Sequence, residues 1–267
     1  MPQVLHLQSE RQSVPDLVHA ALTEPEDVAW NAVCLLHRRG TRDVFEAAHR
    51  LCRSHTAQER RIGADILGQL GIDQRSFPRE SINMLVHMLA CEPDKEVMQS
   101  ILVALSHHDA PGCVSVVAPF ADHADPWVRH ATVLALMGYD DPRAIERLIY
   151  LSHDRDAAVR DWATFALGTQ LSVDTPDIRR ALLDRLHDTD GDTRSEALLG
   201  LARRGERLIV PTLIHELSHQ HASSVLLEAC EMLHAPELAA PLIAMRGART
   251  IDAVLLERAI AACLLAS

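Results

Sequence analysis

The chain has 267 residues, a formal net charge of -11 at pH 7, 48% hydrophobic residues and only 3% aromatic residues. This length can bury a large core in one domain or in a repeat array. The negative charge argues against nucleic acid and anionic membrane as partners and favours a basic protein. Because the apolar residues are mainly Leu, Ala, Val and Ile, we expect closely packed helices and an all-α protein.

The first residues, MPQVLHLQSERQ, do not resemble a targeting segment. They lack a basic stretch followed by an apolar one, and no later apolar run approaches the length of a membrane span. The six cysteines form no C-x-x-C pair and mostly lie in apolar segments, which is typical of reduced thiols in a core. We therefore expect a cytoplasmic protein without membrane contact, with a first helix at residues 13–23 that caps one end of the fold.

From residue 25 onward the chain repeats itself, because leucines recur every 31 to 38 residues. Eight residues before each leucine stands a residue that is usually valine, and midway between them stands a small or apolar one. Positions i, i+4 and i+8 form one face of a helix, and small residues allow a neighbouring helix to approach closely. The seven leucines are Leu36, Leu67, Leu105, Leu136, Leu167, Leu201 and Leu233.

Oxygen-bearing residues precede five of these predicted helices and are expected to cap their first amides. They are Thr56, Asp94, Asp125, Asp156 and Asp190. Each helix is followed by a short break and a second apolar run, such as PRAIERLIYLSH from Pro142, so each unit is expected to be a helical hairpin. This period predicts a right-handed α-solenoid of about seven hairpins over residues 25–246, with capping helices at 13–23 and 251–265, in a single domain, 1–267.

The segments DPWVRHATVLALM, DAAVRDWATFALG and DGDTRSEALLGLARRGERLIVPTLIHEL resemble the HEAT-like repeats of phycobilisome bilin lyases (PBS-lyase type). More narrowly, RRIGADILGQLG and SEALLGLARRGERLIVPTLIHEL are similar to YibA-type small HEAT-repeat proteins, which are encoded beside Rhs toxins in bacteria. This family is thought to include immunity proteins that bind and silence a toxin domain. The resemblance therefore implies binding and not catalysis.

The stretch IHELSHQH contains H-E-x-x-H, formed by His215, Glu216 and His219. Two histidines four residues apart on a helix can hold Zn²⁺, with the Glu as general base. No third ligand is apparent, and the inward stripe of this helix is expected to leave all three side chains outside the core. We therefore expect no metal site and no cofactor, with adventitious surface binding of zinc or nickel as the alternative. A single His-Glu pair also lacks the repeated pairs that bind iron in HEAT-repeat deoxyhypusine hydroxylases.

Two further patterns allow a structural and a functional interpretation. Arg60, Arg129, Arg160 and Arg194 share one register, which favours bonds to capping carboxylates and carbonyls of adjacent units over a ladder that binds anions. The turns between helices contain more acidic residues than capping requires. This surplus predicts two acidic rims, which serve either solubility or the attraction of a basic partner.

A partner is expected to bind the polar sides of the second helices, which we place on the concave surface, and the acidic rims. Trp127, at a helix start, lies outside the core positions, whereas Trp30 and Trp162 are expected to be packed. The candidate partner-binding residues are Trp127, Glu146, Arg147, Tyr150, Asp154, Asp156, Arg180, Asp184, Asp188, Asp192, His215 and His219.

The leading hypothesis is a protein-interaction scaffold, specifically an immunity protein that covers a basic toxin domain with its concave face and acidic rims. No residue is assigned a catalytic role, because the sequence contains neither G-x-S-x-G nor a glycine-rich phosphate loop. One alternative is a bilin-lyase-like enzyme or chaperone that holds a chromophore in its groove. Another is a HEAT-fold DNA glycosylase, which the acidic charge disfavours.

Overall fold

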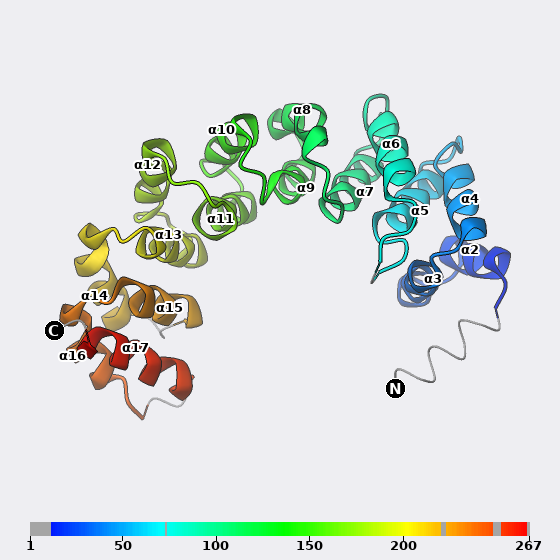
Figure 1. Ribbon diagram of the computed structural model, residues 1–267. Helices are drawn as coiled ribbons and strands as arrows, with labels where there is room; N and C mark the ends of the chain where they lie inside the picture. Colours follow the sequence, from blue (N-terminus) through cyan, green and yellow to red (C-terminus); the bar gives the residue numbers. More distant parts are fainter. Residues whose placement is uncertain (1–11, 73, 220–222, 248–251, 266–267) are drawn as a thin grey trace. The chain divides into compact units, whose positions relative to one another are not determined.

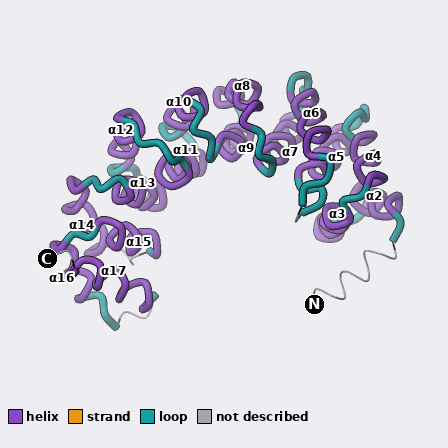
Figure 2. The backbone as a smooth tube through the Cα atoms, viewed as in Figure 1, coloured by secondary structure: helices purple, strands orange, loops and turns teal. Residues whose placement is uncertain are grey.

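The computed structural model describes residues 12–72, 74–219, 223–247 and 252–265 (Figure 1). Over these residues the chain forms helices joined by loops (Figure 2), which confirms the predicted all-α class. The even-numbered helices are α2 (Val14–Thr23), α4 (Arg42–Leu51), α6 (Pro78–Leu89), α8 (Val114–Val117), α10 (Pro142–Leu151), α12 (Pro176–Arg185), α14 (Val210–His219) and α16 (Ala239–Ala244). The odd-numbered helices are α3 (Glu26–Arg39), α5 (Ala57–Gly68), α7 (Lys95–Ser106), α9 (Pro126–Leu136), α11 (Ala157–Phe165), α13 (Gly191–Arg203), α15 (Ser224–Leu233) and α17 (Ala253–Leu265).

Short helical turns extend several of these helices. They are η1 (Pro111–Cys113) and η2 (Ala118–Asp122) around α8, η3 (Ala166–Gln170) after α11, η4 (Arg207–Ile209) before α14 and η5 (Pro236–Leu238) before α16. Apart from η3, a π-helical turn, all are 3₁₀ turns. Each therefore continues a helix of the repeat and adds no new element to the fold.

The chain divides into two compact units, Met1–Leu136 and Met137–Ser267. In the first unit, α3, α5, α7 and α9 pack side by side in chain order, and in the second unit α11, α13, α15 and α17 do the same. The even-numbered helices cover these rows. Each unit thus has two layers of helices, which we call the odd layer and the even layer. The single-domain organisation stays a prediction.

The structure corrects the expected pairing of helices within hairpins. We expected each capped helix to pair with the helix that follows it, but α4 packs mainly on α5, α6 on α7 and α12 on α13. Each capped helix therefore pairs with the helix before it. In the turn between α12 and α13, Asp188 accepts from Arg185 of α12 and from the N–H of Asp190, the cap of α13, and so links the two helices. The expected capping helices form in place as α2 and α17, but they pair with α3 and α16.

The seven repeat leucines are all buried, and the small residues between the helices allow close approach. A Cβ atom on Gly200 of α13 would lie only 2.5 Å from the Cα atom of Gly168 in the preceding repeat. The position eight residues before the leucine is buried less regularly, because Val28 is half exposed and Val225 only partly buried. The predicted helix face is therefore fully buried in the middle repeats and only partly buried in the outer ones.

Close packing in the odd layer also corrects the expected concave surface. Within the second unit, taken by itself, α11, α13, α15 and α17 follow the inner side of the curve, whereas α10, α12, α14 and α16 follow the outer side (Figure 1). Small residues such as Gly168 and Gly200 bring the odd helices closer together, so this unit bends toward them. The second helices of the predicted hairpins do not line its concave side.

Four of the six cysteines are buried as free thiols, in agreement with their expected core positions, while Cys91 is exposed. No helix within the described part of the chain is long and apolar enough to cross a membrane.

Candidate protein-binding surface

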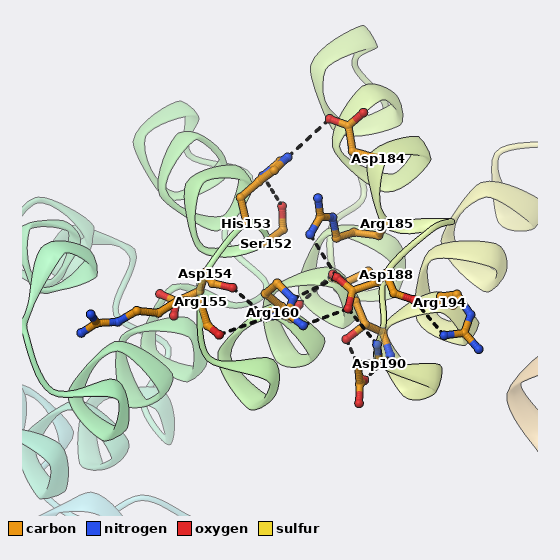
Figure 3. A network of polar contacts seen from close by, with 12 residues as sticks. Ser152, His153, Asp154, Arg155, Arg160, Asp184, Arg185, Asp188, Asp190 and Arg194 are labelled. Atoms are coloured by element: carbon orange, nitrogen blue, oxygen red, sulfur yellow. Dashed lines mark hydrogen bonds and ion pairs between the residues drawn. The ribbon is translucent and has the colours of Figure 1, made fainter.

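Arg160 shows how the repeated arginine register is used (Figure 3). Its Nε and Nη2 atoms donate to the two carboxylate oxygens of Asp188, each at 2.9 Å, and its Nη1 donates to the carbonyl of Asp154 at 2.9 Å. Asp188 also accepts from Arg185 at 3.1 Å and from the backbone N–H of Asp190 at 3.0 Å. The hydrogen bond to Asp188 raises the pKa of the Arg160 guanidinium. This side chain ties two successive turns together.

The same arrangement recurs at the other arginines of the register. Arg60 donates twice to Glu92, at 2.7 and 2.8 Å, and Arg194 donates to Glu216 at 3.1 Å. Arg129 is buried, and its Nη1 donates to two carbonyls of the preceding turn at 2.9 and 3.0 Å. The structural interpretation of the register is thus confirmed, and the alternative of an anion-binding ladder is wrong.

Most of the predicted rim carboxylates also serve the turns. Asp156 accepts from the N–H of Ala158 at 3.1 Å as the cap of α11, and Asp154 accepts from the N–H of Asp156 at 2.8 Å. The side chain of Asp188 is only 4% exposed, so it is no surface for a partner. Among the five predicted caps, the side chain of Thr56 makes no capping hydrogen bond, and its own N–H donates to Ser54 Oγ at 3.1 Å. The surplus acidity in these turns is largely explained by folding.

Within the H-E-x-x-H motif, the glutamate makes a buried structural contact, whereas the first histidine lies on the surface. Glu216 is buried against Arg194, contrary to the expectation that it lies off the core, so it is not a free general base. His215 is exposed, and the side chain of His219 lies outside the described residues. Within the described residues, no group of three or more His, Cys, Asp or Glu side chains could hold a metal ion. The motif therefore contributes to packing between α13 and α14.

Seven of the twelve predicted partner-binding residues lie on the even layer of the second unit, not on its concave side (Figure 1). They are Glu146, Arg147 and Tyr150 on α10, Arg180 and Asp184 on α12, and His215 and His219 on α14. The correction follows from the close packing of the odd helices described above. Arg180 bonds Asp177 at 3.1 Å, and Asp184 lies 3.4 Å from His153, so two of them are engaged in local ion pairs. The part they take in binding stays a prediction.

All three tryptophans are substantially exposed, and all lie on odd-layer helices. Trp127 is 62% exposed at the start of α9, outside the core positions of the repeat. Trp30 on α3 is 51% exposed and Trp162 on α11 is 39% exposed, which contradicts the expectation that both are packed. The ring of Trp162 lies 5.7 Å from that of Phe165 in an edge-to-face arrangement. Large exposed aromatic side chains are frequent contributors to protein interfaces.

An acidic surface on the odd layer of the second unit stands beside Trp162. We call it the inner acidic surface and define it by four carboxylates on three adjacent helices: Asp161 on α11, Asp192 and Glu196 on α13, and Glu228 on α15. One oxygen of Asp161 and one of Glu196 are buried without a hydrogen-bond partner. Unlike the turn carboxylates, these two therefore do not have their full bonding capacity met by the fold.

The carboxylates of this surface lie close enough to repel one another, and burial and this repulsion raise the pKa of two of them. Burial first, and then Asp190 and Asp192, raise the pKa of Asp161 from 3.8 to about 6. Burial first, and then Asp161, Glu228 and Asp192, raise the pKa of Glu196 from 4.5 to about 7. A cationic group placed among these carboxylates would relieve their repulsion and satisfy the buried oxygens. The surface is thus suited to Lys or Arg side chains.

Sequence reasoning identified only Asp192 among these four carboxylates. The signal that could have found the others is their position, because Asp161, Glu196 and Glu228 lie between the anchors of the capped helices, where the repeat has no structural need of a carboxylate. The acidic residues of the turns are more numerous and form the clearer pattern. Because the second helices were expected on the concave side, the carboxylates of the capped helices were not predicted to form a surface there.

Comparisons with known proteins support this architecture. Residues 82–168 match the family described as HEAT repeats. Protein YibA of Escherichia coli strain K12 is 28% identical over 201 residues, which cover 73% of this chain and 71% of YibA. The X-ray structure of E. coli YibA has a TM-score of 0.77 at 24% identity and covers 97% of this chain and 95% of its own. A crystal structure of importin beta has a TM-score of 0.66 at 14% identity, over 99% of this chain and 43% of its own. The family match thus covers residues 82–168, and the fold of the whole chain is similar to that of E. coli YibA.

Proposed function

We propose that this HEAT-repeat protein is a protein-interaction scaffold that binds a basic segment of a partner on the inner acidic surface of its second unit. The observation that carries the proposal is the pair of buried carboxylate oxygens, on Asp161 and Glu196, that have no hydrogen-bond partner among the described residues. An unsatisfied buried oxygen costs free energy that an incoming donor recovers. The exposed ring of Trp162 supplies apolar contact area beside it.

The more specific proposal is that the partner is a toxin domain and that the protein acts as its immunity protein. It rests on the resemblance to YibA-type proteins and on the net charge of -11, which favours a basic partner. In this proposal the protein covers the toxin without catalysis in the cytoplasm, a reducing compartment that suits the cysteine spacing of the sequence.

The binding test uses an octapeptide of alternating Lys and Arg, titrated calorimetrically at low and moderate salt. The triple variant Asp161→Asn, Glu196→Gln, Glu228→Gln should bind the peptide at least about tenfold more weakly than the wild type and with a smaller dependence on salt.

The matched control removes three exposed carboxylates that lie outside the odd layer of the same unit and are not candidate partner-binding residues: Asp140→Asn, Asp177→Asn and Glu237→Gln. The control should bind within about twofold of the wild type, since the net charge changes equally but the inner acidic surface is intact. Equal losses in the two triple variants would reduce the interaction to general attraction between opposite charges. A loss in the control alone would assign binding to a surface outside the odd layer and contradict the proposal.

The toxin assignment has a separate test in cells. A basic toxin domain encoded beside the gene should arrest growth when expressed alone and permit growth when this protein is co-expressed. Growth arrest that persists despite a soluble protein would refute the immunity role. That result would leave the peptide measurement, and hence the scaffold proposal, unaffected.

A further inference from the structure

The first unit contains a groove of quite different character, between α4 and α6 of its even layer. The groove has a volume of about 670 Å³. Binding sites for small molecules usually occupy about 300 to 1,000 Å³. Its floor includes Phe45 and Met84, both buried, and its walls carry polar side chains from both helices.

One end of this groove holds paired charges of both signs, and the other end holds arginines without a carboxylate partner among the described residues. At the end formed by the helix starts, Arg42 lies 3.2 Å from Glu46 and 3.8 Å from Glu80, which are the two carboxylates of the lining. At the other end, Arg50 and Arg53 are exposed and make no ion pair or side-chain hydrogen bond with any described residue. Many other arginines in the described part of the chain have a carboxylate partner, as Arg60 and Arg160 do, whereas this pair has none there.

Two histidines complete the basic end of the groove. His49 of α4 is partly buried and His87 of α6 is exposed, and both line the cavity. Burial first, and then the charges of Arg53 and Arg42, lower the pKa of His49. The positive field that opposes a proton on His49 is the same field that attracts an anion.

Beside the groove, Phe77 caps α6 and precedes a proline. Its φ of 53° and ψ of 43° are a left-handed conformation that is unfavourable for a residue other than glycine. Its ring lies 5.2 Å from the ring of Phe45. The guanidinium of Arg42 lies 4.9 Å from the Phe45 ring centre and 5.1 Å from that of Phe77. Arg42 is therefore fixed by its neighbours, whereas Arg50 and Arg53 keep their donors available.

We propose that this groove is a binding site for a small aromatic anion. Arg50 and Arg53 hold the phosphate or carboxylate group through charge-assisted hydrogen bonds, with Asn83 and His87 as further donors from α6. The aromatic body of the ligand lies over the Phe45 and Met84 floor. This site lies in the first unit and is independent of the inner acidic surface, so either proposal can fail without the other.

The test is a calorimetric titration of the full chain with phenyl phosphate, benzoate and inorganic phosphate. Phenyl phosphate should bind the wild type, and the double variant Arg50→Gln, Arg53→Gln should bind it at least about tenfold more weakly. The matched control Arg38→Gln, Arg203→Gln removes two exposed arginines away from the groove and should bind within about twofold of the wild type. Thermal unfolding followed by circular dichroism checks that both variants remain folded.

Several results would overturn the proposal. Absence of binding by the wild type up to about 10 mM phenyl phosphate would mean that the groove holds no such ligand. An equal loss in the control variant would reduce the effect to net charge. Inorganic phosphate that binds as tightly as phenyl phosphate would remove the aromatic part of the assignment. Tighter binding of a hexaglutamate peptide than of phenyl phosphate would assign the groove to an acidic protein segment instead.

Discussion

Replacing Glu196 by Gln should stabilise the folded protein at alkaline pH, because the wild-type carboxylate is ionised there at a cost. The pKa of Glu196 rises from 4.5 to about 7 in the folded chain, first through burial and then through Asp161, Glu228 and Asp192. A carboxyl with a raised folded-state pKa contributes stability that is fully present below pH 4.5 and is lost as the pH rises through about 7.

The magnitude follows from this displacement of the pKa. Each pH unit corresponds to about 1.4 kcal/mol, which gives about 3 kcal/mol as an upper limit for Glu196. Because the side chain is only partly buried and solvent screens its neighbours, we expect about 1 to 2 kcal/mol of stabilisation at pH 8.5. Adding Asp161→Asn should give less than the sum of the two single effects, because the two carboxylates repel each other.

The assay is urea unfolding of the wild type, Glu196→Gln and the exposed even-layer control Glu146→Gln at pH 8.5 and pH 4. The urea midpoint of Glu196→Gln should exceed that of the wild type at pH 8.5 and match it at pH 4. The control should stay within about 0.5 kcal/mol of the wild type at both values. A destabilised Glu196→Gln at pH 8.5 would show that the carboxylate is satisfied within the fold. That result would refute both the electrostatic reasoning and the observation on which the proposed function rests.

Three other predictions concern packing and titration. Glu216→Gln removes the carboxylate that accepts a hydrogen bond from Arg194 of α13. The free energy of unfolding, measured with urea, should fall by about 1 to 3 kcal/mol, and an unchanged midpoint would contradict a structural role for this residue. Gly200→Ala should lower the free energy of unfolding by about 1 to 3 kcal/mol or more, because the new Cβ atom would lie 2.5 Å from the Cα atom of Gly168. Gly112→Ala adds a Cβ atom in open space and should lower it far less in the same assay. Similar losses in the two variants would argue against the close approach of the two glycines. Burial lowers the pKa of His37 and of His108, so stability should fall as the pH drops through 6.5. The titration midpoint of both imidazoles, followed by their proton signals, should lie below 6.5, and a midpoint at or above 6.5 would be inconsistent with burial.

The candidate site was only partly accessible to sequence reasoning. The arginine register and the carboxylates around it were predicted as a structural ladder, and the structure confirms this at Arg60, Arg160 and Arg194. The second helices, which carry most of the predicted binding residues, were expected on the concave side but follow the outer side of the second unit (Figure 1). Since a helix can present its polar side to either side of a two-layer array, hydrophobic periodicity identifies the buried stripe but not the direction in which the array bends.

What the sequence by itself determined lies within single helices and turns. The buried leucine face and the capping aspartates depend on spacings of two to eight residues, and such local chemistry can be read directly from the chain. Only the tertiary structure decided the pairing of α4 with α5, the burial of Glu216 and the joining of Asp161, Glu196 and Glu228 into one surface. The physical reason is that these features depend on how closely helices about 30 residues apart approach each other. That distance is set by the sum of many small contacts, such as Gly200 against Gly168, and not by any local pattern.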